Sequence, residues 1–372
     1  MKLAKFPMLL ILTITSFTGF QIALGDTVGS DFGIIEDLLP SGDRIFFFET
    51  DHSIKSPYWI HDTRIMVSDF DGTRKVSDEL FIFPTNLKQN SDYLFFTVLS
   101  DTCVNSTICD YQDIIKMSKS DGSYQKIIKD LKSAAHISIG DSLFVSESNG
   151  KIWKISLDGK SRHLLTESQN IIMDIVSNGD EVYWIEEIED MNNKIMRIKD
   201  GNIETLATDL KIPYDLGVYD NILHWNEIQV KPERGAFAEF TVIKRYQENS
   251  VVIIDEYENT SPVSVPHIPH YGPYLQYGSY IFVVNNTKSS PEIHLIETNS
   301  KTKFDIVSVD YNIRYLRADD NNLYVIGQNN NGFMIEKFPL PVAIPEFSSM
   351  LVFTTSVIGL SLLILLKQSF HY

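Results

Sequence analysis

Histidine pairs and runs of acidic and aromatic residues are the parts of this sequence whose chemistry could serve binding or catalysis. His267 and His270 form the only close histidine pair, in a proline-rich stretch. Two imidazoles can share a metal ion, but this pair lacks the helical face and the Glu base of an HExxH site. We expect a rigid surface loop there, and metal binding is the alternative hypothesis.

Aromatic and acidic residues alternate in two further places, around Trp184 and Glu186 and around Trp225 and Glu227. Aromatic faces stack on sugars or cations, and carboxylates accept hydrogen bonds from hydroxyl groups or bind Ca²⁺. These four residues are therefore candidates for a sugar- or cation-binding rim. The competing interpretation is that they are strand residues, whose aromatic side chains fill the space between neighbouring sheets.

Other acidic runs predict turns rather than sites. Asp69-Phe70-Asp71-Gly72 lacks the third acidic position and the Glu of a calcium-binding loop, so we expect a hairpin, and Asp319-Asp320 is interpreted as a turn as well. The sequence contains no nucleophile elbow, P-loop, dinucleotide fingerprint or HExxH motif. No catalytic residue and no cofactor is predicted, and Ca²⁺ stays an open alternative.

Two cysteines, Cys103 and Cys109, enclose a short loop. In an exported chain such a pair is expected to form a disulfide, because a tetrahedral metal site would need further Cys or His ligands nearby. The loop also contains a glycosylation sequon. Three asparagines are candidate acceptors, each just outside a strand motif: Asn105, Asn259 and Asn285.

The formal net charge of −17 argues against a polyanionic partner. A protein that binds nucleic acid needs clustered Lys and Arg to replace counterions, and no such cluster is present. We therefore predict no nucleic-acid partner. An acidic surface of this kind keeps an extracellular protein soluble.

A strand motif recurs seven times between residues 42 and 324, at intervals of roughly 40 to 60 residues, which is typical of a propeller or another repeat array. The motif is a small or polar residue, Asp, a variable residue and a hydrophobic run. Its recurring Asp lies in a turn just before the strand, next to Gly in three of the copies, so we interpret it as a turn residue rather than a catalytic carboxylate. The copies are GDRIFFF from Gly42, SDYLFF from Ser91, GDSLFV from Gly140, GDEVYW from Gly179, YDNILHW from Tyr219, YGSYIFVV from Tyr277 and NNLYVIG from Asn321.

Asp-Gly pairs recur in phase with this motif and predict hairpin turns. The third unit shows four short strands, each followed by a turn, which is one blade of a β-propeller. The predicted fold class is therefore all-β, with four-stranded antiparallel blades. We count seven blades, with six or eight as alternatives. The last unit has only three strands, and we expect residues 27–32 to complete it.

The segment Tyr183-Trp184-Ile185-Glu186, followed by IMRIKDG, resembles the blades of YWTD-type and TolB-like propellers. The resemblance covers residues 33–338 by pattern. His224-Trp225-Asn226-Glu227 is a more distant match, and the six blades usual in YWTD domains differ from the seven counted here. The resemblance implies the propeller architecture and no particular binding residue.

The ends of the chain carry membrane-targeting signals. Residues 1–25 have the layout of a secretory signal peptide, with Lys2 and Lys5 before a short apolar stretch; an uncleaved anchor is the alternative. We expect residues 26–338 to form the propeller and residues 339–347 to form a proline-rich linker. Residues 348–366 carry no charge and would extend about 28 Å as a helix, enough to span a bilayer. A short tail follows at 367–372.

Pro345, Glu346 and Phe347 stand directly before that predicted transmembrane helix. The arrangement resembles the PEF-type C-terminal sorting signals of archaeal surface proteins, although Ser348 stands where Gly is usual. The resemblance implies recognition by an archaeosortase, removal of the tail and transfer to a surface anchor. A plain transmembrane anchor is the alternative. A GPI signal fits less well, because no polar spacer precedes the hydrophobic tail.

These features predict a propeller held outside the cell that binds a protein or glycan partner without catalysis. A secreted propeller enzyme, such as a lyase or hydrolase, is the competing hypothesis. It would require His, Arg or carboxylate side chains to converge on the central axis. A structural component of a surface layer is a third hypothesis.

Overall fold

A computed structural model describes the propeller in fourteen ranges: 26–50, 62–69, 72–103, 110–132, 134–188, 192–219, 221–233, 236–258, 274–277, 280–285, 290–297, 303–319, 321–329 and 332–340. The predicted signal peptide, the Pro345-Glu346-Phe347 motif and the predicted transmembrane helix lie outside these ranges. Within them, no helix is long and apolar enough to cross a membrane.

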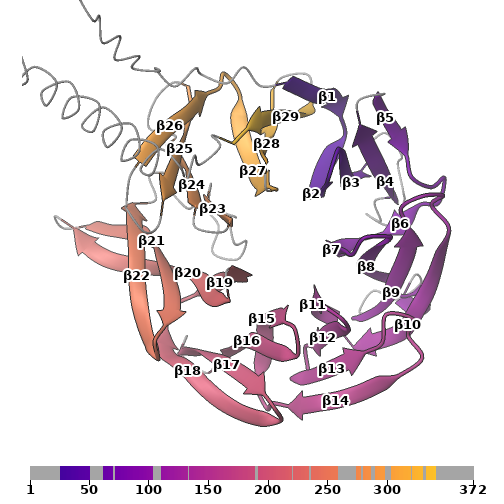
Figure 1. Cartoon of the computed structure of the whole chain (residues 1–372), viewed down its shortest axis with the longest axis vertical. Helices are drawn as coiled ribbons and strands as arrows, with labels where there is room; N and C mark the ends of the chain where they lie inside the picture. Colours follow the sequence, from indigo (N-terminus) through magenta and orange to yellow (C-terminus); the bar gives the residue numbers. More distant parts are fainter. Residues whose placement is uncertain are drawn as a thin grey trace, which may run out of the picture.

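The described strands form seven sheets arranged as a ring, which confirms the predicted seven-bladed propeller (Figure 1). Blades are numbered here from the N-terminus, and each runs from an inner strand near the axis to an outer strand. Blade 1 consists of β2 (Ile34–Ser41), β3 (Arg44–Thr50), β4 (Asp62–Asp69) and β5 (Gly72–Lys75), with β6 (Phe81–Ile82) also paired to β4. Blade 2 consists of β7 (Thr85–Gln89), β8 (Tyr93–Leu99), β9 (Tyr111–Ser118) and β10 (Tyr124–Lys132).

The next four blades repeat this order. Blade 3 consists of β11 (Ala134–Ile139), β12 (Leu143–Glu147), β13 (Lys151–Ile155) and β14 (Arg162–Glu167); blade 4 of β15 (Ile171–Asn178), β16 (Glu181–Glu187), β17 (Asn193–Lys199) and β18 (Asn202–Leu210). Blade 5 consists of β19 (Pro213–Tyr219), β20 (Ile222–Glu233), β21 (Ala236–Gln247) and β22 (Ser250–Glu258); blade 6 of β23 (Tyr274–Tyr277), β24 (Tyr280–Asn285), β25 (Glu292–Glu297) and β26 (Lys303–Ser308). A single 3₁₀ turn, η1 (Asp101–Cys103), follows β8.

Blade 7 is completed by the N-terminal strand. It contains β27 (Asn312–Ala318), β28 (Asn322–Gln328) and β29 (Phe333–Pro339), and β1 (Asp26–Phe32) is the fourth strand. β1 pairs antiparallel with β29, from Asp26 opposite Lys337 to Phe32 opposite Phe333. This confirms the expected closure by residues 27–32. The two ends of the propeller are thus held in one sheet, which leaves no unpaired terminal blade.

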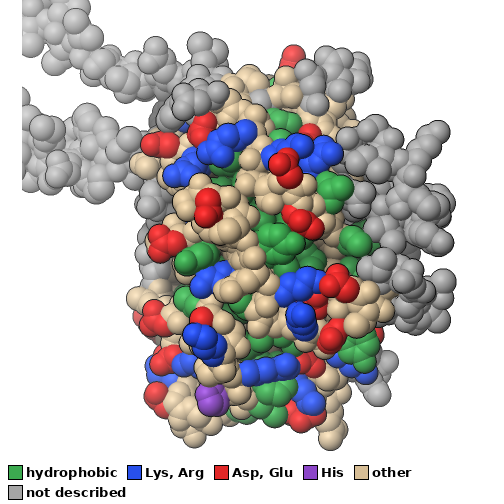
Figure 2. Space-filling model, turned by 90° about the vertical axis from the view of Figure 1, so that its right-hand side faces the viewer, with side chains coloured by type: hydrophobic (Ala, Val, Ile, Leu, Met, Phe, Trp, Pro, Cys, Tyr) green, Lys and Arg blue, Asp and Glu red, His purple; other side chains and the backbone are tan. Residues whose placement is uncertain are grey.

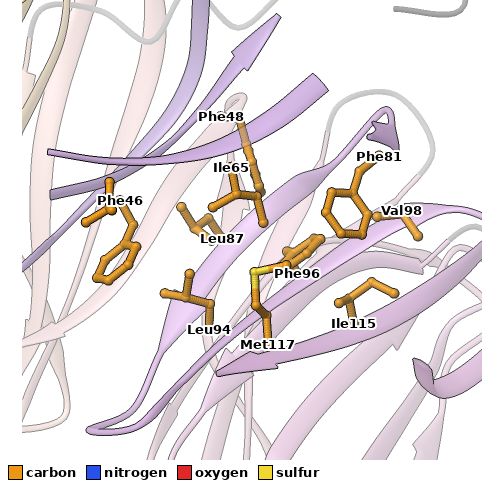
Figure 3. Packing of buried hydrophobic residues seen from close by; sticks show 11 residues of the cluster. Phe46, Phe48, Ile65, Phe81, Leu87, Leu94, Phe96, Val98, Ile115 and Met117 are labelled. Carbon is orange, nitrogen blue, oxygen red and sulfur yellow. The ribbon is translucent and has the colours of Figure 1, made fainter. Parts of the chain in front are cut away.

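The hydrophobic run of each strand motif forms the second strand of a blade, and neighbouring blades cover both of its faces. Between blades 1 and 2, Phe48 packs edge-on against Phe96 with ring centroids 5.5 Å apart, and Phe81 packs against the same ring at 5.1 Å (Figure 3). Full burial of each such side chain stabilises the fold by about 1.5–3 kcal/mol. The continuous apolar runs, rather than an alternating pattern, reflect this two-sided burial.

The predicted Asp-Gly turns are hairpins between third and outer strands. Gly122 and Gly159 have φ of +70° and +74°, in the left-handed region that Gly adopts readily. A Cβ on Gly122 would lie 1.9 Å from the carbonyl oxygen of Val76, and one on Gly159 would lie 2.5 Å from that of Ile127. These turns therefore need Gly both for their backbone angle and for close packing against the preceding blade.

The strands of each blade are connected at two opposite faces of the ring. On one face the first and second strands, and the third and outer strands, are joined mainly by short turns. On the other face the second strand of a blade ends and its third strand begins. The outer wall seen in Figure 2 carries Lys and Arg side chains interspersed with Asp and Glu.

Candidate functional site

Six of the seven inner strands carry a register shift in their pairing with the second strand. The shifts lie between Ile35 and Leu38, Thr85 and Lys88, Ala134 and His136, Ile172 and Asp174, Tyr214 and Gly217, and Ile313 and Tyr315. A bulge bends a strand and re-aims its side chains. The inner strands surround the axis of the ring (Figure 1), and neighbouring inner strands contact one another. Polar side chains of these strands make the contacts described below. We call this set of residues the axial site.

One half of the axial site links blades 7, 1 and 2. Asp37 on β2 accepts a hydrogen bond from the N–H of Leu38 at Oδ1 (2.8 Å) and from the N–H of Leu87 on β7 at Oδ2 (3.2 Å). Arg317 on β27 lies 3.2 Å from Asp37 Oδ1. Lys88 directly follows Leu87. We call these residues the first arc.

The other half links blades 3, 4 and 5 in the same way. Asp174 on β15 accepts from the N–H of Ile175 at Oδ1 (2.8 Å) and from the N–H of Leu216 on β19 at Oδ2 (2.9 Å). His136 on β11 places its Nδ1 3.7 Å from Asp174 Oδ1. Asp215 directly precedes Leu216. These residues form the second arc.

The two arcs share the same pattern of backbone hydrogen bonds to an Asp carboxylate. In each, a carboxylate accepts the N–H of its own next residue and the N–H of a Leu in the following blade. Each Leu follows a residue in the left-handed region, Asn86 with φ +59° or Asp215 with φ +57°. Asn and Asp tolerate this region better than other non-Gly residues. The bulge geometry and the residue types therefore agree in both arcs.

Charged groups of both arcs contribute to the pKa of Asp215. Partial burial raises the pKa of Asp215; Asp174 raises it further, whereas Arg317 and Lys88 oppose the increase. Asp215 nevertheless keeps an exposed surface, as expected for a side chain that protein atoms surround on several sides and that still meets solvent along the axis. Asp215, Asp174, Arg317 and Lys88 belong to four different blades. Hydrogen bonds from the N–H groups of Leu87 and Leu216 to the Asp of the preceding blade hold the inner strands of each arc together.

His136 is the titratable base of the site. Burial lowers its pKa, the ammonium of Lys88 lowers it further, and Asp174 opposes both effects. The imidazole is therefore neutral at neutral pH. Its side chain is 34% exposed and that of Asp174 is 25% exposed, so both groups remain accessible to a ligand.

The axial site offers hydrogen-bonding groups of both charges. Lys88 is exposed and has no hydrogen bond or ion pair among the described residues. Asp215 accepts one hydrogen bond, from Asn226 Nδ2 at 3.1 Å. Within the fourteen described ranges, no group of His, Cys, Asp and Glu has an arrangement suited to a metal ion.

The residues predicted to form an exposed rim lie inside the ring wall instead. Trp184 and Trp225 are each 1% exposed, Glu186 is 6% exposed and Glu227 is 1% exposed. Trp184 packs with residues of blades 3 and 4, and Trp225 with residues of blades 4 and 5. The prediction of a rim is wrong, because neighbouring blades cover both faces of the second strand. The competing interpretation, aromatics that fill the space between blades, describes these positions.

Glu227 and Glu186 have ion-pair or hydrogen-bond partners inside their own blades. Glu227 accepts from Lys244 Nζ at 2.8 Å and from Gln229 Nε2 at 2.6 Å. Glu186 accepts from Trp184 Nε1 at 3.1 Å. Glu147 on β12 stands at the equivalent position of blade 3 and is also buried. These carboxylates belong to the packing of second strands rather than to a surface.

Other sequence candidates fall outside the described residues. This applies to His267, His270, Asn105 and Asn259, and the side chain of Asn285 at the end of β24 is not described either. Cys103 is buried and disulfide-bonded. Its predicted partner Cys109 lies outside the described ranges.

The axial site itself was not predicted from the sequence. A signal for it exists in retrospect, because Asp37-Leu38 and Asp174-Ile175 both stand shortly before a Gly-Asp turn of the strand motif. The turn Asp recurs in most copies of the strand motif, whereas an inner-strand Asp at this distance recurs in few, so its pattern is weak. Lys88, His136 and Arg317 follow no repeat, so only the folded ring identifies them.

No family model and no curated protein matches the sequence. Solved structures do match. The β-propeller domain of the Trilobed protease from Pyrococcus furiosus is 10% identical with a TM-score of 0.57, over 83% of this chain and 94% of that one. That domain is described as having an open velcro topology, whereas here β1 closes the ring against β29.

Two peptidases also resemble the chain in fold. Pyrococcus horikoshii acylaminoacyl peptidase has 12% identity and a TM-score of 0.55, with coverage of 86% of this chain and 54% of that one. Tricorn protease has 12% identity and a TM-score of 0.53, over 86% of this chain and 34% of that one. This chain thus spans about half or a third of those proteins. At such identities the similarity shows the fold alone: a seven-bladed β-propeller, similar to propeller domains of peptidases.

Proposed function

We propose that the protein is a non-catalytic binding module that presents its axial site to a charged protein partner outside the cell. The observation that carries the proposal is the set of charged inner-strand groups that meet between blades, with Arg317 3.2 Å from Asp37 and His136 3.7 Å from Asp174. Lys88 and Asp215 are exposed next to the backbone N–H groups that Asp37 and Asp174 hold. Binding sites on rigid repeat scaffolds are commonly built in this way, from side chains that several units contribute.

The chemistry of the axial site favours a protein over a neutral glycan. Sugar binding relies on exposed aromatic faces beside hydroxyl acceptors, and the aromatic candidates Trp184 and Trp225 are buried. The axial site instead contains both an exposed ammonium, Lys88, and an exposed carboxylate, Asp215. Charged groups of both signs complement the ends and side chains of polypeptides.

The location outside the cell rests on the sequence. We propose export by residues 1–25 and attachment through the C-terminal segment, either by sorting at Pro345-Glu346-Phe347 with an archaeosortase or by a plain transmembrane helix. An extracellular position agrees with a disulfide at Cys103. The intact mass of the mature protein tests the sorting route: a C-terminus beyond Lys367 would contradict it.

The binding proposal is tested with the full-length protein on immobilised peptide and glycan arrays. We expect charged peptides to be retained, and the axial double variant K88M/D215N to lose them. The matched control is K129M/D141N, which makes the same changes on the outer wall and in a turn, where Lys129 and Asp141 are exposed. Equal retention by both double variants, or retention of glycans alone, would overturn the proposal.

One observation favours a second candidate function, a hydrolase or lyase at the axis. His136 is neutral at neutral pH and stands beside Asp174, as a general base held by a carboxylate does. Incubation of retained ligands with the wild type and H136Q, followed by mass spectrometry, separates the two functions. Conversion of a ligand by the wild type and not by H136Q would establish the enzyme and contradict a non-catalytic module.

A further inference from the structure

We propose that the edge of β22, the outermost strand of blade 5, binds an extended segment of a partner protein as an added strand, and that this segment is aliphatic with basic residues at its ends. The surface is separate from the axial site, because β22 lies at the outside of the ring and β19 of the same blade lies at the axis (Figure 1). β22 pairs with β21 and with no second described strand. Alternate residues of an edge strand direct their N–H and C=O groups outward, where another chain can pair with them.

The first part of β22 differs from the other outer strands because it carries no charge. Its first five residues are Ser250, Val251, Val252, Ile253 and Ile254. A charged residue on an edge strand opposes pairing with further chains. Every other outer strand has such a residue near its start: Asp26 in β1, Arg74 in β5, Lys126 in β10, Arg162 in β14, Glu204 in β18 and Lys303 in β26. Among the described outer strands, only β22 lacks this protection.

Three consecutive apolar side chains of this edge meet solvent. Val251, Val252 and Ile253 are 41%, 36% and 54% exposed. Successive residues of a strand point to opposite faces of the sheet, so the outer part of blade 5 is accessible on both faces here. The pairing of β22 with β21 is regular up to Ile253, and the register shift that follows leaves Ile254 as an extra residue. A partner strand therefore meets a short, regular and apolar edge.

Acidic residues flank this edge and indicate which partner fits it. Glu248 is exposed in the turn before β22, and Glu256 is exposed beyond the register shift. Antiparallel pairing of β22 with the β22 of a second copy, centred on Val252, would place Glu248 of one copy opposite Glu256 of the other. Like charges directly opposite each other are destabilising, and two copies with a net charge of −17 each also repel one another. Aliphatic residues flanked by Lys or Arg instead complement both the edge and the glutamates.

Fluorescence anisotropy of labelled peptides with the full-length protein tests the inference. We expect the peptide Lys-Thr-Val-Thr-Val-Thr-Lys to bind, and the same peptide with Glu at both ends to bind about tenfold or more weakly. A Lys-ended peptide that is N-methylated at its central residues should also bind about tenfold or more weakly, because it cannot donate backbone hydrogen bonds to the edge. E248K should reduce the preference for the Lys-ended peptide over the Glu-ended one.

Two variants of exposed isoleucines locate the surface. I253K gives β22 the kind of charge that the other outer strands carry, and it should weaken binding of the Lys-ended peptide about tenfold or more. The matched control is I203K, which makes the same change on the outer strand β18 at a residue that is 49% exposed, and it should leave binding unchanged. The axial variant K88M/D215N should also leave binding unchanged, which separates this surface from the axial site.

Equal binding by I253K and I203K, equal affinity for the Lys-ended and Glu-ended peptides, or no binding up to the solubility of the peptide would overturn the inference. A wild-type dimer that I253K converts to a monomer in analytical ultracentrifugation would overturn it too, because a second copy would then occupy the edge. Loss of binding in K88M/D215N with binding retained in I253K would assign the peptide to the axial site. That result would contradict the edge proposal and leave the proposed function standing.

Discussion

The two arcs of the axial site share a backbone geometry and differ in their charges. In the first arc, Asp37 meets Arg317, a group that is always charged. In the second, Asp174 meets His136, whose lowered pKa leaves it neutral at neutral pH. Both arcs therefore need a carboxylate that accepts two backbone N–H groups. The neighbour of that carboxylate differs: a charged guanidinium in one arc and a neutral imidazole in the other.

The second strands of the blades also differ in charge between the two halves of the ring. Blades 3, 4 and 5 each place a buried glutamate at the same position of the second strand: Glu147, Glu186 and Glu227. Blade 1 has the half-buried Glu49 there, and blades 2 and 7 have Val98 and Gly327. The second arc is thus the more ionisable half of the ring, and we expect substitutions and acid to affect it first.

The largest expected effect is the loss of Glu227. E227A leaves the 11% exposed side chain of Lys244 without its 2.8 Å ion-pair partner, and removing one partner of a buried pair costs about 3–5 kcal/mol of the free energy of unfolding. E49A should cost much less, because Glu49 is only half-buried. Thermal unfolding of both variants measures the contrast. The double variant E227A/K244M should recover much of the loss; no recovery would mean that packing and not charge accounts for it.

Acid should destabilise blade 5, whose inner strand belongs to the second arc, through His224 on its second strand. Burial lowers its pKa to about 4, with a smaller contribution from Arg245. An imidazole with a lowered pKa takes up its proton more readily in the unfolded chain. Its contribution is therefore complete above about pH 6.5 and lost as the pH falls toward 4, by up to about 3 kcal/mol.

H224F tests this effect. The equivalent positions of the other blades hold Phe or Tyr, among them Phe46, Phe95 and Tyr324. We expect the variant to fold and to lose less stability than the wild type between pH 6.5 and 4 in urea unfolding. Asp215, with its raised pKa, acts in the opposite direction, but it is common to both proteins and cancels in the difference. Parallel stability curves for the two proteins would contradict the prediction.

A smaller effect is expected at the two inner-strand carboxylates. Asn keeps one acceptor oxygen, so D37N and D174N each lose one of two backbone hydrogen bonds, at a cost of about 1–3 kcal/mol. D37N should cost more, because Arg317 also loses its partner. Hydrogen exchange at the N–H groups of Leu87 and Leu216 reports each arc separately. Unchanged exchange at both sites would show that the carboxylates do not link the blades.

The sequence predicted the parts of the molecule that repeat. Seven hydrophobic second strands, the Asp-Gly hairpins and closure by residues 27–32 all follow from periodic patterns with a direct structural cause. The rim at Trp184 and Trp225 failed because alternation along a strand indicates which side chains share a face, but not whether a neighbouring blade covers it. The axial site escaped prediction because its residues are close only across blades, and the bulges that re-aim them leave no clear trace in the sequence.

The most direct test is a crystal structure of the protein soaked with a charged peptide that the arrays retain. We predict the peptide at the axis between the two arcs. A peptide seated elsewhere on the ring would contradict a site formed jointly by the two arcs.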